Sequence, residues 1–332
     1  MAGVKALRRI QLGRETTDGT AVAATTVWRG LGTIEDAREV VFPNEDIGLL
    51  VGADRTYVPK LEALITFDSV EATYEQLPHL LEAGVMTATP TTDTGTGIIY
   101  TYNFPTTAQK TIKTYTIEGG DDQQAEEMEY SFVKSLSLSG NASEAVMMSA
   151  DWIGRQVTNT AFTATTDAPI PTVEEILFSK GKLYIDNDTD AFGTTQKSNT
   201  LLSMDLSVNT GMQEKYTATG NLYFSDHKQV MPEITLNLTF EHDATSVAEK
   251  IAWRNETARL VRLRFDGSAL TTTGAYDTKT LIVDLAGKWD NFDKIGEQDG
   301  NDVISATFRA RYNSVAAKLG TIIVVSELAA LP

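Results

Sequence analysis

The sequence predicts a mainly β protein with two tandem β-sandwich or barrel domains, residues 1–160 and 161–332, each with one flanking α-helix. Three observations support this prediction. Short runs of Val, Ile, Thr and aromatic residues alternate with polar residues and end at Gly, Asn, Asp or Pro, as strands do. Helical patterns are few. One strand–helix block occurs twice in a chain of 332 residues, which is long enough for two cores.

In the first half, an N-terminal arm of basic character leads into the domain. The alternation predicts strands over 4–12, 27–34, 40–42, 61–67, 98–104, 113–118 and 130–138. Leu77, Leu80 and Leu81 have helical spacing, so a helix is expected over about 70–83, with Pro78 in its first turn or at a kink.

In the second half, strands are expected over 182–185, 201–208, 217–224, 234–240, 261–265, 279–285 and 304–312. A helix over about 245–256 carries Val247 and Ile251 on its apolar face. Residues 158–172, with Pro169 and Pro171 among small polar residues, are expected to link the two domains.

The two halves repeat one order of elements. Pro59 and Pro232 each begin an alternating run that ends at Phe67 or Phe240, and an Ala-Thr pair and a helix follow both runs. The match predicts that 98–104, 113–118, the acidic loop 119–127 and Phe132 correspond to 261–265, 279–284, 293–302 and Phe308. Five elements in one order favour duplication of a single unit.

Composition excludes several classes of function. The chain has no cysteine, so disulfides, thiolate nucleophiles and Cys-ligated metals are excluded. The net charge of −17 opposes tight phosphate binding, because that affinity comes from Lys and Arg. The longest apolar runs, such as 319–325, are far shorter than the roughly 20 residues of a membrane-spanning helix, and no stretch of signal-peptide length follows Met1.

No motif predicts catalysis, a cofactor or a metal site. The histidines, His79, His227 and His242, are scattered and are expected to be surface or edge residues, and no Walker A, G-x-G-x-x-G or H-E-x-x-H pattern occurs. Asp186, Asp188 and Asp190 alternate as in a calcium loop. Ala191 and Lys197 stand where that loop needs glycine and glutamate, so a polar hairpin turn is favoured.

Paired carboxylates and tryptophans leave two carbohydrate-related alternatives open. The pairs Asp121-Asp122, Glu126-Glu127 and Glu174-Glu175 could serve a glycosidase, but solvated loop positions explain them more simply. The four tryptophans could form a sugar-stacking platform, although partly buried packing residues are favoured: Trp28, Trp152, Trp253 and Trp289.

The opening of the chain and the duplicated block carry a family resemblance. A short basic strand, 4–12, precedes Gly13-Arg14-Glu15-Thr16-Thr17-Asp18-Gly19-Thr20-Ala21-Val22-Ala23-Ala24-Thr25-Thr26 and then Val27-Trp28-Arg29-Gly30. With the repeated strand–helix–strand order, this resembles the tail tube (major tail) proteins of long-tailed, siphovirus-type bacteriophages. The resemblance covers most of the chain as architecture, although its motifs are diffuse.

The resemblance implies a structural virion protein that assembles into stacked rings, with a channel through which double-stranded DNA passes as non-specific cargo. A duplicated chain implies a homotrimer with pseudo-sixfold symmetry. Tape-measure and tail-tip proteins would be partners, with synthesis in the host cytoplasm and no membrane involvement. The region 35–57 would match a long loop that reaches a neighbouring subunit or ring.

Two sets of residues follow from this resemblance. Expected inter-subunit contacts are apolar residues of the arm and the long loop: Val4, Leu7, Ile10, Val41, Phe42, Ile47 and Leu49. Because an acidic wall would not bind DNA, part of the carboxylate excess is expected at the lumen, or in solvated loops: Asp121, Asp122, Glu126, Glu127, Glu297 and Asp299. The alternative functions are a carbohydrate-binding adhesin or tail spike module and, less favoured, a two-carboxylate glycan hydrolase.

Overall fold

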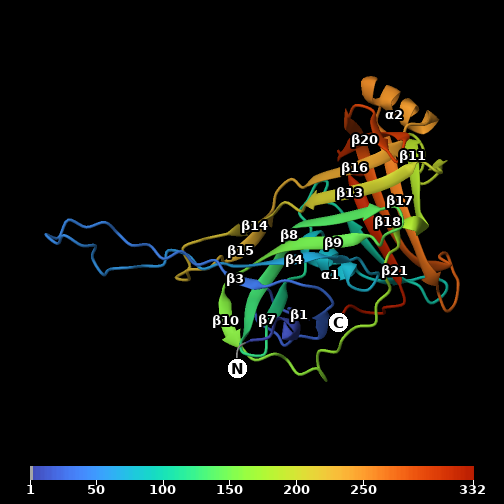
Figure 1. Cartoon of the computed structure of the whole chain (residues 1–332). Helices are drawn as coiled ribbons and strands as arrows, with labels where there is room; N and C mark the ends of the chain where they lie inside the picture. The colour runs from blue at the N-terminus through green and yellow to red at the C-terminus, as the bar shows by residue number, and fades with distance from the viewer. Residues whose placement is uncertain (1–2) are drawn as a thin grey trace.

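The computed structural model describes residues 3–332 and is mainly β (Figure 1). Its first unit runs from a short 3-10 turn, Lys5–Leu7, to strand β10 and contains one α-helix. The elements are β1 (Arg9–Arg14), β2 (Thr26–Trp28), β3 (Ile34–Asp36), β4 (Ala63–Glu71), α1 (Leu77–Gly84), β5 (Thr91–Thr92), β6 (Ile98–Asn103), β7 (Tyr115–Gly120), β8 (Ala125–Asn141), β9 (Met147–Gly154) and β10 (Val157–Thr160).

The second unit begins at the 3-10 turn Phe178–Lys180 and also contains one α-helix. Its elements are β11 (Gly181–Asn187), β12 (Gln196–Lys197), β13 (Leu201–Asn209), β14 (Met212–Lys215), β15 (Asp226–Gln229), β16 (Glu233–Glu241), α2 (Ala244–Arg254), β17 (Arg259–Ala269), β18 (Thr278–Phe292), β19 (Gly296–Gln298), β20 (Asn301–Ala310) and β21 (Gly320–Ser326).

The antiparallel strand pairings of the first unit recur in the second. The pairs β1–β2, β1–β7, β7–β8, β8–β10, β8–β9, β4–β9 and β3–β4 have the counterparts β11–β12, β11–β17, β17–β18, β18–β21, β18–β20, β16–β20 and β13–β16. The helix follows β4 in one unit and β16 in the other. Each unit is therefore the same β-sandwich with one helix.

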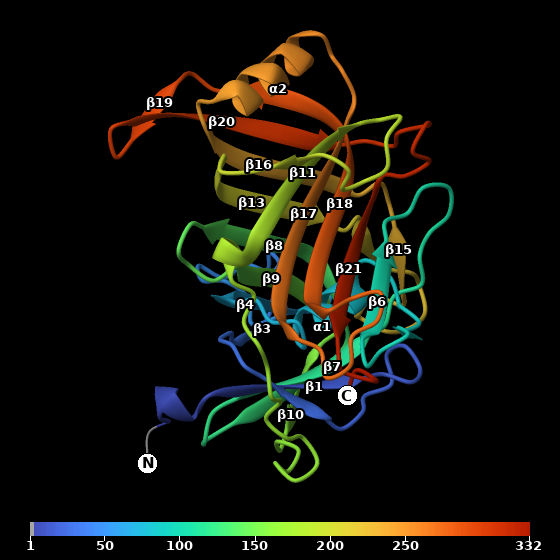
Figure 2. The same ribbon diagram turned by 90° about the vertical axis from the view of Figure 1, so that its right-hand side faces the viewer.

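A central sheet runs through both units. Its strand order is β3–β4–β9–β8–β13–β16–β20, with the end of β18 and then β19 on the outer side of β20, and the pairing of β8 with β13 joins the units (Figure 2). The long strands β8 and β18 leave this sheet and continue into the second sheet of their own unit, where β7 and β17 pair with them. One strand that contributes to two sheets closes each sandwich at a corner.

Aromatic residues fill the two cores in similar ways. Phe67 of β4 lies between Trp28 and Trp152, with ring centroids 4.7 and 5.2 Å away, and is fully buried. At the matching position of β16, Phe240 is also fully buried and packs edge-on against Trp289, 5.9 Å away. These rings explain why the alternating runs that begin at Pro59 and Pro232 both end in phenylalanine.

The correspondence predicted for the later strands was displaced by one strand. By strand pairing, β7 corresponds to β17, β8 to β18 and β9 to β20, whereas the sequence match placed residues 98–104 opposite 261–265. The cause is an insertion. Strands β5 and β6 have no counterpart in the second unit, and β6 pairs with β21 of that unit instead.

Several local predictions also need correction. Strand β4 extends to Glu71 and the helix begins only at Leu77, and residues 217–224 form the end of the β14–β15 hairpin rather than a strand. Residues 40–42 make only the isolated bridge from Val41 to Tyr57. The predicted linker 158–172 starts inside β10 and then packs along the first unit, where the carbonyl of Pro169 accepts the N–H of Val27.

Candidate functional site

The outward face of the central sheet carries small polar side chains on every strand. Apolar residues point into the sandwich and hydroxyl, amide and carboxylate groups point out, because successive side chains on a strand face opposite sides. We call this surface the polar face. Its residues include Thr66, Asp68, Ser135, Ser137, Ser139, Ser149, Asp151, Ser203, Asp205, Ser207, Glu233, Thr235, Asn237, Thr239, Ser305 and Thr307.

Neighbouring side chains on the polar face bond across strands. The Ser135 hydroxyl donates to Asp151 over 2.6 Å, and the Thr66 hydroxyl donates to the same carboxylate over 2.8 Å. The Thr307 hydroxyl donates to the Asn237 side-chain oxygen over 2.7 Å. Such cross-strand pairs stabilise the sheet.

The charge on the polar face is mostly negative. Asp68, Asp151, Asp205 and Glu233 are all exposed on it. The guanidinium of Arg309, at the end of β20, donates to Asp290 over 3.1 Å, so its charge is compensated locally, and the exposed Lys288 of β18, its cross-strand neighbour, adds one further cation at this end of the face. The face therefore offers few cations to a phosphate backbone, whose binding depends on Lys and Arg.

Residues 37–62, between β3 and β4, extend far from the body (Figure 1). We call this segment the arm, as distinct from the N-terminal arm. Its apolar side chains are solvent-exposed: Phe42 is 70% exposed and Leu50 fully so, and Ile47, Leu49, Val51 and Tyr57 are each more than half exposed. Apolar side chains gathered on one projecting segment are typical of a surface that another molecule covers. Between β13 and β16, the matching place in the second unit, lies the β14–β15 hairpin.

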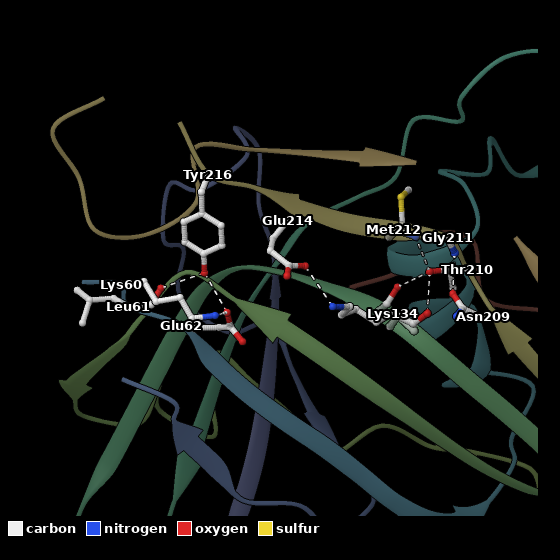
Figure 3. Close-up of polar contacts among 11 residues, drawn as sticks. Lys60, Leu61, Glu62, Lys134, Asn209, Thr210, Gly211, Met212, Glu214 and Tyr216 are labelled. Atoms are coloured by element: carbon white, nitrogen blue, oxygen red, sulfur yellow. Dashed lines mark hydrogen bonds and ion pairs between the residues drawn. The ribbon is translucent and has the colours of Figure 1, made fainter. Parts of the chain in front are cut away.

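The base of the arm is hydrogen-bonded to the end of the β14–β15 hairpin (Figure 3). The Tyr216 hydroxyl donates to Glu62 over 2.9 Å, and the N–H of Leu61 donates to the carbonyl of Leu222 over 2.9 Å. Lys134 on β8 bonds Glu214 over 3.1 Å. Burial and the Glu62 carboxylate raise the pKa of Tyr216 well above its usual value. The end of the hairpin therefore lies against the base of the arm.

The predicted contact residues fall into two groups. Val4, Leu7, Phe42, Ile47 and Leu49 are exposed, and Val41 is half-buried at its bridge to Tyr57. Ile10 is different, because it lies on β1 opposite Trp28 and is only 2% exposed. Its side chain is covered within its own unit, so it leaves the set of contact candidates.

The predicted acidic residues lie away from the polar face. Asp121 and Asp122 are at the β7–β8 turn, and Glu126 and Glu127 are on the part of β8 that pairs with β10. Glu297 lies on β19 and Asp299 in the turn after it, with a φ of 52°. None of the six side chains shares a strand face with Asp151 or Asp205.

One buried polar cluster was missed by the sequence reasoning. His79, expected at the surface, is 3% exposed on α1, and its Nδ1 lies 3.1 Å from the Tyr115 hydroxyl. That hydroxyl donates to Glu82 over 3.0 Å, and Arg14 makes a two-pronged pair with the same carboxylate at 2.9 and 2.7 Å. Burial, reinforced by Arg14, lowers the pKa of His79 to about 3.

This cluster has the properties of a structural tie. The Tyr115 hydroxyl is fully buried and its pKa is raised well above the usual value, chiefly by burial. Every member is bonded to another, and Arg14 also donates to the carbonyl of Leu331, which anchors the C-terminal segment. The cluster therefore links β1, α1, β7 and the chain end.

The remaining candidates have structural roles. Asp186 accepts the N–H groups of Gly193, Thr194 and Thr195 and so shapes the β11–β12 hairpin, which agrees with the predicted polar turn. Over residues 3–332, no group of three or more His, Cys, Asp or Glu side chains could hold a metal ion. The tryptophans pack in or against the aromatic cores rather than forming a platform, since three are 5% exposed or less and Trp253 stacks near Phe292.

The sequence carries a signal for the polar face that was overlooked. Ser or Asn occupies every second position from Ser135 to Asn141, and β13 and β16 show the same spacing with Ser, Asp, Thr and Asn. Alternation by itself predicts only that these segments are strands. Its outward half also specifies which chemistry the sheet presents.

Comparison with known proteins identifies the family. The family model described as "Phage tail tube protein" matches residues 6–311, which is nearly the whole chain. No curated protein matches the sequence. Within the described residues, neither helix has the length and apolar character needed to cross a bilayer.

Proposed function

The chain belongs to the phage tail tube protein family and is a structural component of the virion tail, and we propose that it forms the tube by stacking rings of itself around a DNA channel. The polar face would line this channel. The observation that carries the proposal is that one continuous sheet spans both units and presents hydroxyl, amide and carboxylate groups on a single side.

Physical reasoning supports turning this face inward. DNA carries one charge per about 1.7 Å of axis, so a lumen rich in uncompensated Lys and Arg would hold it. The polar face has Asp68, Asp151, Asp205 and Glu233, and several of its hydroxyls are hydrogen-bonded to neighbouring side chains on the same face. Such a wall repels phosphates weakly and offers them few free hydrogen-bond donors. The duplex could slide along it.

The duplication supports a trimeric ring. If residues 1–160 and 161–332 are equivalent units, three chains supply six units and a ring with pseudo-sixfold symmetry. The recurrence of seven strand pairings in one order supports this division, and β10, the last strand of the first set, ends at Thr160.

The arm is proposed to connect rings. Its exposed apolar residues, with Val4 and Leu7 near the N-terminus, would be covered by neighbouring chains. Tape-measure and tail-tip proteins are proposed as further partners of the assembled tube, and the protein would be made in the host cytoplasm.

Negative-stain electron microscopy of the purified chain tests assembly. Rings or tubes with a central channel are expected, and dispersed single chains at high concentration would contradict the proposal. Labelling then tests which surface faces the lumen, since the chain has no native cysteine. Ser207→Cys in tubes should react with a small maleimide but not with a bulky polymer-linked one, whereas both should react in dispersed chains.

Asp122→Cys, on the β7–β8 turn, is the matched variant. If its labelling by the bulky reagent is blocked in tubes while Ser207→Cys stays reactive, the acidic turn lines the lumen instead of the polar face.

A further inference from the structure

Within the chain, the two units are joined by the pairing of β8 with β13. The strand edges that correspond to these two, on β3 and on β18–β19, are unpaired among the described residues. Residues Ser203–Asn209 of β13 pair with Asn141–Ser135 of β8 over seven positions. By the recurring pairings, β3 corresponds to β13, and the segment that runs from the end of β18 through β19 corresponds to the outer half of β8. Within residues 3–332, no strand pairs with the outer edge of β3 or of β19.

The two open edges lie at opposite ends of the central sheet. Figure 2 shows β19 beside β20 at one end and β3 beside β4 at the other. Unpaired edges present free N–H and C=O groups and readily accept another strand. A single chain cannot pair its own two edges across the width of the sheet.

The equivalence of residues can be followed through the register. Ile65 on β4 corresponds to Leu238 on β16, and their partners are Ile34 and Met204, so Ile34 corresponds to Met204. On the other side, Phe67 and Phe240 pair with Ala150 and Ile304, which makes Ser149 equivalent to Val303. The partners of that pair are Ser137 and Gly296, so Gly296 corresponds to Ser137.

One side chain at the open edge lacks the cover that its counterpart has. Ile295, next to Gly296, corresponds to Leu136 of β8. Leu136 is 2% exposed, packed in the core with Val208 of β13 as its cross-strand neighbour, whereas Ile295 is 51% exposed. An added strand at this edge would give Ile295 a cross-strand neighbour like the one that Leu136 has.

We propose that a second copy of this chain adds its β3 edge to the β18–β19 edge, in the register of the β8–β13 joint. Transferring that register pairs Glu35 with Gln298, Ala37 with Gly296 and Glu39 with Lys294. The last pair sets opposite charges side by side, which stabilises cross-strand neighbours. The joint rests on the proposed ring assembly and specifies which edges meet in it.

Disulfide trapping tests the joint, because the chain has no native cysteine. The variant carries Glu35→Cys and Gln298→Cys, and the internal reference carries Asp205→Cys and Ser139→Cys, which pair directly within one chain. Both are oxidised after assembly and run on non-reducing gels. The first should give dimers and trimers, and the second should give a cross-linked monomer.

A mixed pair of single variants shows that the link is between chains. Glu35→Cys mixed with Gln298→Cys should give a dimer, and each alone should not. If rings or tubes form and the internal reference closes but Glu35→Cys with Gln298→Cys gives no dimer, the joint is wrong and assembly still stands. If no rings or tubes form with the unmodified chain, the ring proposal itself fails.

Charge reversal gives a second reading without cysteine. Glu39→Lys should lower the yield of rings, and Glu39→Lys combined with Lys294→Glu should restore it. Equal yields for all three proteins would overturn this register.

Discussion

The two α-helices occupy the same place in their units and have very different surroundings. All eight residues of α1 are buried, whereas α2 buries only Ser246, Glu249 and Ala252 and leaves Val247 and Ile251 43% and 50% exposed. Strand β6 helps to cover α1, where the Tyr102 hydroxyl donates to the carbonyl of Pro78 over 3.3 Å. The helix of the first unit is therefore covered within the chain, in part by the inserted strand β6. The helix of the second unit leaves an apolar surface exposed to solvent.

The largest expected effect comes from truncating one apolar residue on each helix. Leu80→Ala removes a fully buried side chain and should lower the free energy of unfolding by about 2–5 kcal/mol. Ile251→Ala should cost below about 1 kcal/mol, since the side chain is half exposed. Urea denaturation of dispersed chains measures both, and equal losses would break the comparison.

For ring formation, in contrast to unfolding, a change on α2 should have a large effect. Ile251→Asp should leave the urea midpoint of dispersed chains close to that of the unchanged protein and reduce ring formation, because it puts a charge on a surface that we expect a neighbour to cover. Rings formed in normal yield would show that this side of α2 stays in solvent.

The sequence predicted the fold class, both helices and most strands because alternation and helical spacing are local properties. It misplaced the later repeat elements because β5 and β6 make a single-unit insertion, and only the pairing of β6 with β21 reveals this. His79 was misjudged for a related reason. Its partners Tyr115 and Arg14 are distant in sequence, and neither spacing nor composition brings them together.

A second contrast between the helices is their response to acid, because only α1 carries a buried histidine. The pKa of His79 is lowered to about 3 in the folded chain, against about 6.5 when unfolded. The contribution of the neutral His79 to the free energy of unfolding is therefore complete above pH 6.5. It is lost as the pH falls toward 3, by about 1.4 kcal/mol per pH unit. Stability measured by urea denaturation between pH 7 and 4 should show this slope.

His79→Gln isolates the effect. Glutamine can still donate to the Tyr115 hydroxyl but does not titrate, so the variant should lose less stability on acidification than the unchanged chain. His242→Gln, outside the helices, is the matched control. Parallel curves for His79→Gln and the unchanged chain would show that another group controls the acid response.

The smallest expected effect concerns how the helices begin. In α2, the Asp243 side chain accepts the N–H of Ser246 over 2.9 Å and the Ser246 hydroxyl accepts the N–H of Asp243, which is a capping box. α1 has no side-chain cap and relies on Pro78 and burial. Asp243→Ala should therefore cost about 1 kcal/mol, and Gln76→Ala should cost no capping energy. Thermal unfolding checks the difference: a helix held mainly by its packing tolerates a weak start, whereas the half-exposed α2 depends on its own local bonds.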